Sequence, residues 1–351
     1  MMPMVKNTST YLKYENLEKL IKTYFFIIAS FILIIIPIFL PLGFSPDSLN
    51  YYITIKLPIS QFNFLSFEPF YWLVVYINQI LFGGSWVAFL LFFSATYVIL
   101  SAYLIARYSI SPVISFIILV LLFYPNFGLI QIRNGVSIAF IWWGFFNLLE
   151  GKKWKFIIKT MIATLFHYAS IVFLLVLLLD KNCINKKFYL LLPLIGFFLG
   201  QYVFNVEFYQ FIISYLPIFL KFKAQAYLDF VIYGPQEHRL NQINLLNMYS
   251  LFTIMVYYLG LLISSNDRYF ISLEKILAFG IFSFFAFKTI PVFSFRISNN
   301  FFTFMVFLIP YILKNYKKEE KYLVYYLLIL ILVLLSWNIY IRHDLFDFSL
   351  I

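Results

Sequence analysis

Charged residues are scarce in this sequence: Lys, Arg, Asp and Glu make up 12% of the 351 residues, whereas 63% are hydrophobic. A soluble domain usually carries about 25% charged residues, and half that fraction is too little to cover a water-soluble surface. The composition therefore excludes a soluble enzyme. At about 20 apolar residues per span, a chain of this length has room for roughly ten transmembrane helices.

Cysteine, histidine and glycine are also rare. The single cysteine, Cys183, excludes an intramolecular disulfide and a cysteine-based metal site. No two of the three histidines are four residues apart, and there is no Asp-x-Asp motif, glycine-rich phosphate loop or Walker-type lysine. We therefore expect no metal, no cofactor and no ATP-driven transport. With only 12 glycines, close packing of helices through small residues is not expected to dominate.

The charge balance is strongly basic, with 26 Lys and Arg against 15 Asp and Glu and a formal net charge of +11. In a membrane protein such an excess marks cytoplasmic loops before it marks a nucleic-acid surface. We therefore expect the protein to have the lipid bilayer as a partner and to bind no nucleic acid.

The apolar tracts indicate one integral membrane domain over residues 1–351. Residues 1–23 contain an amphipathic stretch expected on the cytoplasmic surface, and the first span is expected at Tyr24–Leu42. Two long loops, 43–66 and 205–244, are expected on the periplasmic side. The further apolar tracts lie near 67–82, 86–106, 111–127, 130–149, 154–180, 188–204, 245–265, 273–292, 297–314 and 321–341.

Lysines mark three short loops, near 152–155, 181–187 and 314–321, and the positive-inside rule places all three in the cytoplasm. A straight span over 154–180 would separate the first two, so this segment is predicted to enter and leave on the same side, with its turn near His167. Tract 67–82 then has to be a surface helix or a re-entrant hairpin, which the break at Glu68-Pro69 allows.

This arrangement has nine full spans, with the N-terminus inside and the C-terminus outside. Eleven straight spans with the same termini are the alternative. We therefore predict an all-α polytopic membrane protein of about 9–11 transmembrane helices with re-entrant or interfacial helices.

Ionisable residues at membrane depth are informative because burying a charge there is costly unless a partner or water is present. The nine-span arrangement places several on the outer side, namely Asp47, Glu68, Arg133, His167, Lys288 and Arg296, with Lys221, Lys223, Tyr227, Glu237, His238 and Arg239 in the loop 205–244. They predict an outward-facing cavity. Clustered guanidinium groups suit a diphosphate, and an imidazole or carboxylate beside them can take a proton from a hydroxyl group.

Each of these residues also has a purely structural interpretation. Arg133 and Arg296 can anchor helices at the membrane interface. Asp47 and Glu68 can cap the first turn of a helix. His167 can be a neutral histidine bonded to a carbonyl of a neighbouring helix.

Five short motifs follow one another along the chain: Ser45-Pro-Asp-Ser-Leu-Asn-Tyr-Tyr52, Phe67-Glu-Pro-Phe-Tyr71, Gln131-Ile-Arg-Asn-Gly-Val-Ser-Ile-Ala139, Leu165-Phe-His-Tyr-Ala-Ser170 and Phe295-Arg-Ile297. Their order resembles the EpsG-like group of bacterial polysaccharide polymerases, related in role to the Wzy O-antigen and capsule polymerases. The resemblance covers mainly residues 45–180, with weaker support near 290–310. The family often has Arg-Gln where this chain has Arg133-Asn134, which leaves the role of Asn134 open.

The resemblance implies a GT-C-like fold and a metal-independent glycosyltransferase in the bacterial inner membrane, with its active site facing the periplasm. Such an enzyme transfers a growing glycan from undecaprenyl diphosphate to the non-reducing end of a lipid-linked repeat unit, in the synthesis of O-antigen lipopolysaccharide, capsule or exopolysaccharide. The lipid-linked oligosaccharide is then a partner, and a chain-length regulator is a candidate partner.

In this interpretation Arg133 and Arg296 contact the diphosphate, and Arg239 or Lys221 closes over it from the loop. Clustered cations would stabilise the charge that develops on the leaving diphosphate.

His167 is the first choice for the general base, because the unperturbed pKa of histidine lies near working pH. Glu68 and Asp47 are the runners-up. Four tyrosines are candidate platforms for sugar stacking, with lipid-interface anchoring as the alternative: Tyr51, Tyr52, Tyr71 and Tyr227.

Two other functions remain open. A flippase for the same lipid-linked glycan also needs a cationic cavity, but transporters commonly carry internal repeats and broken helices at matching positions, and the sequence shows neither. An O-antigen ligase-type transferase shares the chemistry and differs in its acceptor.

Overall fold

The computed structural model describes residues 8–62, 67–179, 182–234 and 243–342, and every regular element in them is a helix. The α-helices are α1 (Thr8–Ile35), α2 (Pro46–Lys56), α3 (Pro69–Phe82), α4 (Trp86–Tyr108), α5 (Pro112–Ile118), α6 (Ile132–Leu149), α7 (Lys153–Phe166), α8 (Lys186–Tyr202), α9 (Val206–Ser214), α10 (Ile218–Tyr233), α11 (Met248–Leu262), α12 (Arg268–Ala286), α13 (Pro291–Phe302), α14 (Met305–Lys314) and α15 (Lys318–Arg342). The shorter elements are the 3₁₀-helices η1 (Ile36–Phe39), η2 (Ile59–Gln61) and η5 (Tyr168–Leu178) and the π-helices η3 (Leu119–Phe123) and η4 (Pro125–Ile130).

These helices confirm the predicted all-α, polytopic membrane class. Within the described ranges, α4 and α12 are each long and apolar enough to cross a membrane, and there are up to four such spans if the bent pairs α8–α9 and α13–α14 each count as one. Shorter apolar helices accompany them, including α3, η5 and α11. The total of nine to eleven spans stays a prediction.

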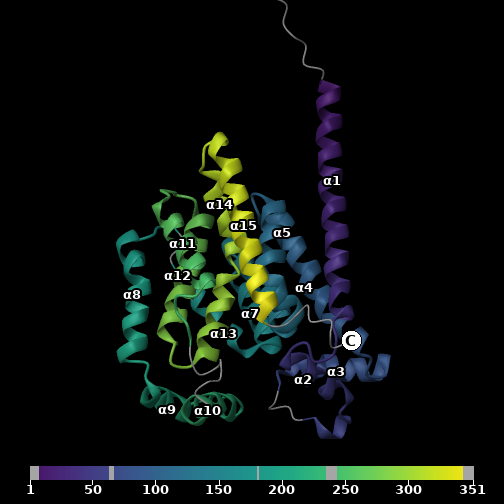
Figure 1. Cartoon of the computed structure of the whole chain (residues 1–351), viewed down its shortest axis with the longest axis vertical. Coiled ribbons are helices and arrows are strands. Elements are labelled where there is room, and N and C mark those ends of the chain that lie inside the picture. The colour runs from purple at the N-terminus through teal and green to yellow at the C-terminus, as the bar shows by residue number, and fades with distance from the viewer. Residues whose placement is uncertain (1–7, 63–66, 180–181, 235–242, 343–351) are drawn as a thin grey trace, which may run out of the picture.

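Several loops meet at one end of the molecule, called here the lysine-rich end and defined by Lys152 and Lys186. Lys152 lies 2.6 Å from the carboxylate of Glu150, to which the Tyr108 hydroxyl also donates; these two bonds hold the pKa of Glu150 below its ordinary value. The Tyr269 hydroxyl in the first turn of α12 donates to the Tyr108 carbonyl, and Lys186 donates to the loop joining α11 to α12. This end lies at the top of Figure 1.

Residues 153–178 form a helical hairpin and do not cross the molecule as one straight span. The backbone of His167 is extended, with φ −154° and ψ 112°, and this ends α7 and starts η5. The rings of Phe156 in α7 and Phe173 in η5 pack with their centroids 5.9 Å apart. The hairpin therefore leaves the lysine-rich end, turns at His167 and returns.

The two segments expected as long loops contain helices. Segment 43–66 holds α2 and η2, and segment 205–244 holds α9 and α10. In Figure 1 these helices and α3 lie at the end opposite the lysine-rich end, called here the site end. At the N-terminus, α1 runs from Thr8 to Ile35 and η1 continues to Phe39, so the two helices cover most of the first expected span. The cytoplasmic placement of residues 1–23 stays a prediction.

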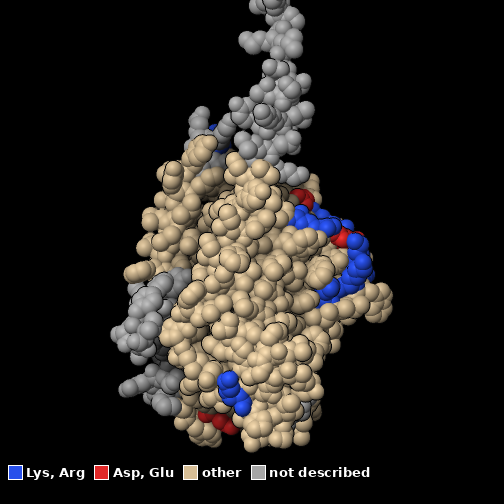
Figure 2. All heavy atoms as spheres, turned by 90° about the vertical axis from the view of Figure 1, so that its right-hand side faces the viewer, with Lys and Arg blue, Asp and Glu red and all other residues tan. Residues whose placement is uncertain are grey.

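The outer surface of the helices is largely apolar. Figure 2 shows a face on which the charged side chains gather in a few places and leave most of the area uncharged. Large apolar side chains are exposed on helices from several parts of the chain, including Phe31 on α1, Leu191 on α8 and Leu330 on α15. Such a surface suits contact with lipid, because a soluble protein rarely exposes large contiguous apolar patches.

Helices α8 and α12 approach closely because α8 carries two glycines one turn apart. A Cβ atom on Gly196 would lie 2.8 Å from the carbonyl oxygen of Phe282, and one on Gly200 would lie 2.3 Å from that of Phe285. This is the small-xxx-small packing of membrane helices. Glycine is rare in the chain as a whole, so composition gave no sign of this local contact.

We expect Gly200→Ala to destabilise the protein by about 1–3 kcal/mol, because the added methyl group overpacks a helix–helix contact. The measurement is the midpoint of thermal unfolding of purified protein in detergent. Leu194→Ala, at an exposed position of the same helix, is the matched control and is expected to change stability by about 0.5 kcal/mol or less. Equal midpoints for Gly200→Ala and wild type would contradict the close packing.

Candidate active site

Glu68 lies between an arginine and a histidine and joins three segments of the chain. It is the N-cap residue of α3, with extended backbone, and Pro69 follows in the first turn. One carboxylate oxygen forms an ion pair with Nη1 of Arg133, and the other lies 3.6 Å from Nδ1 of His167. Glu68 is 3% exposed and His167 is 5% exposed. A buried carboxylate requires partners of this kind, because an unpaired charge is costly in the interior.

Arg133 is held in a box of aromatic rings in the first turn of α6. Its guanidinium carbon lies 4.7 Å from the ring centroid of Phe67, 5.2 Å from Tyr71 and 5.4 Å from Tyr51. Its Nε also donates to the Tyr51 hydroxyl at 3.3 Å. A guanidinium has five N–H donors, so the contacts with Glu68 and Tyr51 leave further donors for an anion.

The backbone before Arg133 is unusual, because two π-helical stretches, η3 and η4, lead into α6. A Cβ atom on Gly135 would lie 2.3 Å from the carbonyl oxygen of Phe127, so η4 approaches the start of α6 very closely. Asn134 donates to the Gln131 side chain at 3.2 Å. π-Helical turns are frequent at functional sites, and here they fix where the first turn of α6 begins.

The turn that carries His167 is anchored by two neighbouring helices. From α6, the Ser137 hydroxyl donates to the Ala163 carbonyl at 2.9 Å and lies 2.5 Å from the Ser170 hydroxyl. From α13, the Asn300 amide donates to the Ala169 carbonyl at 3.2 Å. The imidazole is therefore set with Nδ1 towards Glu68, while Nε2 is buried and has no hydrogen-bond partner among the described residues.

We expect Asn300→Ala to lower kcat about 10-fold with little change in KM, because the turn loses its anchor on α13 while the substrate-contacting groups remain. The measurement is the steady-state rate of glycan chain extension, the activity that the motif resemblance implies, by equal amounts of folded protein. Asn315→Ala, which removes a comparable bond to the Tyr311 carbonyl on an exposed turn, is the control. An unchanged kcat for Asn300→Ala would show that the bond does not position His167.

A second guanidinium approaches the turn from α13. Nη1 of Arg296 donates to the Tyr227 hydroxyl of α10 at 2.7 Å, and its guanidinium lies 5.2 Å from that ring. Arg296 and Asn300 are four residues apart, so they share one face of α13, and Asn300 contacts the turn. Arg296 therefore lies on the face of α13 that also carries the residue bonded to the turn. The site thus gathers two cations, a carboxylate and an imidazole.

The comparison with known protein families identifies the family of this chain. The model of the EpsG family matches residues 22–350, nearly the whole chain. This chain belongs to the EpsG family. The family match extends well beyond residues 45–180, where most of the motifs lie. No curated protein and no solved structure matches the chain.

Membership of the EpsG family supports a membrane-embedded, polysaccharide-polymerase-like role of glycosyltransferase type for this chain. The part of the chain that the structure describes contains no cluster of three or more His, Cys, Asp and Glu residues able to hold a metal.

Other residues that the sequence predicted for the site lie at the edge of the Glu68–Arg133–His167 cluster. Asp47 is in the first turn of α2, one turn before Tyr51, on which it acts electrostatically. Tyr52 packs against Trp86 instead, with ring centroids 5.9 Å apart, and has Lys56 above its ring. The structure therefore brings Tyr51 to Arg133 and directs Tyr52 to the start of α4.

The cations of the loop 205–244 and Lys288, which were also predicted for the site, are not all brought together. Lys221 is exposed on α10, more than one turn away from Tyr227. Lys288 donates to the Gln201 side chain, which gives it a structural contact. Arg239 lies outside the described residues, as do Glu237 and His238.

Sequence reasoning missed two adjacent buried ionisable residues. Glu274 and Lys275 of α12 are 1% and 4% exposed, and Gly260 makes room for the carboxylate, since a Cβ there would lie 1.4 Å from Oε1 of Glu274. Adjacent opposite charges at the start of tract 273–292 were the available signal. The uncharged anchor Ser137 lies within the motif 131–139, and Asn300 was indicated by neither composition nor spacing.

Proposed function

We propose that this protein is a polyprenyl-diphosphate-dependent polysaccharide polymerase. It transfers a growing glycan from undecaprenyl diphosphate to the non-reducing end of a lipid-linked repeat unit. The observation that carries the proposal is the position of Glu68, whose two carboxylate oxygens face Arg133 and His167. The Glu68 carboxylate thereby links the guanidinium of Arg133, which can bind an anion, to the imidazole of His167, which can accept a proton.

The diphosphate of the donor is bound by Arg133 and Arg296. A guanidinium stays charged and can bind two phosphate oxygens with its planar fork. Arg133 also lies in the first turn of α6, where the helix dipole favours an anion. The charge that develops on the leaving diphosphate is stabilised by cations that the aromatic box and Tyr227 already hold in place.

His167 is the general base for the acceptor hydroxyl. The acceptor oxygen attacks the anomeric carbon of the donor sugar, a carbon–oxygen bond forms, and the bond from that carbon to the diphosphate oxygen breaks with its electron pair. The acceptor proton passes to Nε2 of His167. Glu68 keeps Nδ1 of the ring oriented and stabilises the imidazolium, as a carboxylate does for a catalytic histidine.

The reaction takes place on the periplasmic side of the inner membrane, in the synthesis of O-antigen, capsule or exopolysaccharide. Support comes from the two ends of the molecule: the lysine-rich end belongs in the cytoplasm by the positive-inside rule, and the Glu68–Arg133–His167 site lies at the other end. In this orientation we assign a sugar contact to Tyr227, whereas Tyr51 and Tyr71 are buried against Arg133 and hold its guanidinium in place.

The decisive experiment supplies purified protein in liposomes with lipid-linked repeat units and no other acceptor. A ladder of glycans longer than one repeat unit is the expected result. Transfer only to a different acceptor lipid would instead indicate a ligase. Movement of the lipid-linked unit across the bilayer with no ladder would indicate a flippase and would refute the polymerase.

A further inference from the structure

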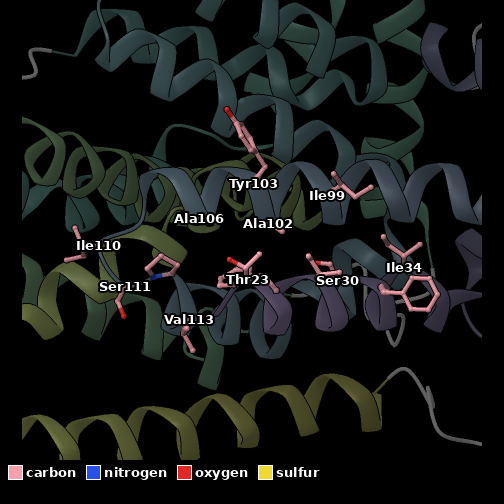
Figure 3. Close-up of a pocket in the computed structure, with 14 residues that line it drawn as sticks. Thr23, Ser30, Ile34, Ile99, Ala102, Tyr103, Ala106, Ile110, Ser111 and Val113 are labelled. Atoms are coloured by element: carbon pink, nitrogen blue, oxygen red, sulfur yellow. The ribbon is translucent and has the colours of Figure 1, made fainter. Parts of the chain in front are cut away.

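A large apolar cavity opens between α1 and α4, on the outside of the helical core. Its volume is about 1140 Å³, above the range of about 300–1,000 Å³ that is usual for small-molecule pockets. Figure 3 shows Ser30 and Ile34 on α1 across from Ile99 and Ala102 on α4, with the α4–α5 connection at one end of the cavity. That connection follows Tyr108 and so lies at the lysine-rich end.

A second cavity, of about 230 Å³, lies further along α4 towards the site end. It is lined by Ala88 and Phe92 of α4, and the first cavity is lined by Ile99 and Ala106. These positions are spaced by four, seven and seven residues, so they fall on one side of the helix. Both cavities therefore open on the same outward face of α4.

The second cavity adjoins the candidate active site through two phenylalanines. Phe70 follows Glu68 by two residues, and Phe166 directly precedes His167; their ring centroids are 5.2 Å apart, and both line the cavity. A chain that extended from the site past these two rings and along α4 would meet the second cavity first, and then Ile99 and the first cavity.

The length of the path along α4 distinguishes a phospholipid acyl chain from a longer apolar chain as the occupant of the two cavities. From Ala88 to Ala106 the helix rises by about 27 Å at 1.5 Å per residue, which is close to the full hydrocarbon thickness of about 30 Å. A phospholipid acyl chain is anchored at one surface and fills only about half of that thickness. An occupant whose head group sits at the site end and whose tail reaches the first cavity must be apolar and as long as the bilayer is thick.

We propose that the outward face of α4, with its two cavities, binds the polyisoprenoid chain of the carrier lipid whose diphosphate occupies the Glu68–Arg133–His167 site. This inference rests on the proposed function for its head-group position. It adds a binding site for the lipid tail on α1 and α4, away from the reacting groups.

The direct test uses a polyprenyl diphosphate without sugar that carries a photoreactive diazirine on its terminal isoprene unit. In wild-type protein in liposomes, crosslinks are expected within residues 99–113 and on the facing part of α1, and excess unlabelled polyprenyl diphosphate should remove them. Crosslinks spread equally over the exposed faces of α8 and α15, or crosslinks at the first cavity that the unlabelled compound does not remove, would overturn the proposal. Because the probe cannot be extended, this result does not depend on polymerase activity.

A second test fills the first cavity. Ala106→Trp is expected to reduce the competed crosslink about 10-fold and to raise KM about 10-fold for a repeat unit on a full-length polyprenyl chain, with kcat unchanged. A repeat unit on a chain of two isoprene units does not reach the first cavity, and its kinetics should match wild type, which also shows that the variant is folded. Leu191→Trp, at an exposed position on α8, is the matched control. Equal effects on long and short substrates would overturn the tail site, whereas failure of the wild type to make any ladder would count against the polymerase alone.

Discussion

Arg133→Ala is expected to abolish chain extension, with a loss of at least about 10²–10³-fold, while the protein still inserts in the membrane. Removing one preorganised group that stabilises developing negative charge costs a reaction about that much. The variant also leaves Glu68 buried without its ion-pair partner, and breaking a buried pair costs about 3–5 kcal/mol of stability. The measurement is the glycan ladder in liposomes at equal amounts of inserted protein.

Two further variants separate the catalytic effect from the structural one. The double variant Arg133→Met, Glu68→Gln removes both charges, so stability is expected to recover while extension stays absent. Arg133→Lys keeps the charge but loses the planar fork and is expected to retain only part of the activity. Arg268→Ala, which removes an exposed arginine at the start of α12, is the control. Long glycans made by Arg133→Ala would refute the diphosphate role.

His167→Gln is expected to lower kcat by about 10²–10⁴-fold, the usual contribution of a general base, with a smaller change in KM. A base must be unprotonated to act, so wild-type activity should rise with pH through the ionisation of the imidazole. That limb of the pH–rate profile should be absent in the variant, which a purely structural role of the ring would not predict. The measurement is initial extension rate across pH at saturating repeat unit.

The companion variants identify the base if it is not His167. Asp47→Asn is expected to keep most of its activity, because Asp47 lies in the first turn of α2, one turn before Tyr51, whereas Glu68 is the carboxylate beside the imidazole. Glu68→Gln is expected to lower kcat, because it weakens both the orientation of His167 and the pairing of Arg133. Full activity in His167→Gln together with an inactive Glu68→Gln or Asp47→Asn would move the base to that carboxylate.

Much of the fold was predictable because hydrophobicity and charge act locally. The apolar tracts anticipated helices such as α3, α4 and α6, and the lysine loops required segment 154–180 to return to the side that it left. The turn at His167 follows from that requirement. The motif order identified the family, and the motifs supplied Glu68, Arg133 and Arg296 as candidates.

Less of the site was predictable, because the relevant contacts join residues far apart in the chain. Two adjacent tyrosines in one motif have different contacts: Tyr51 contacts Arg133, while Tyr52 packs on Trp86. Only the orientation of α2 against α3 and α4 determines which of the two rings faces the site. Phe67 was visible within a motif, but its position over the Arg133 guanidinium was not. Sequence spacing carries no information about such orientations.

The sequence by itself determined that this is an all-α polytopic membrane protein of the EpsG family, with lysines in three short loops and a few ionisable residues at membrane depth. Only the tertiary structure decided that Glu68 bridges Arg133 and His167, that Asn300 anchors the turn between α7 and η5, and that two glycines bring α8 onto α12. The reason is physical: hydrophobic period and charge count are properties of a segment, whereas a bridging carboxylate exists only where packing brings three separate segments within a few ångströms.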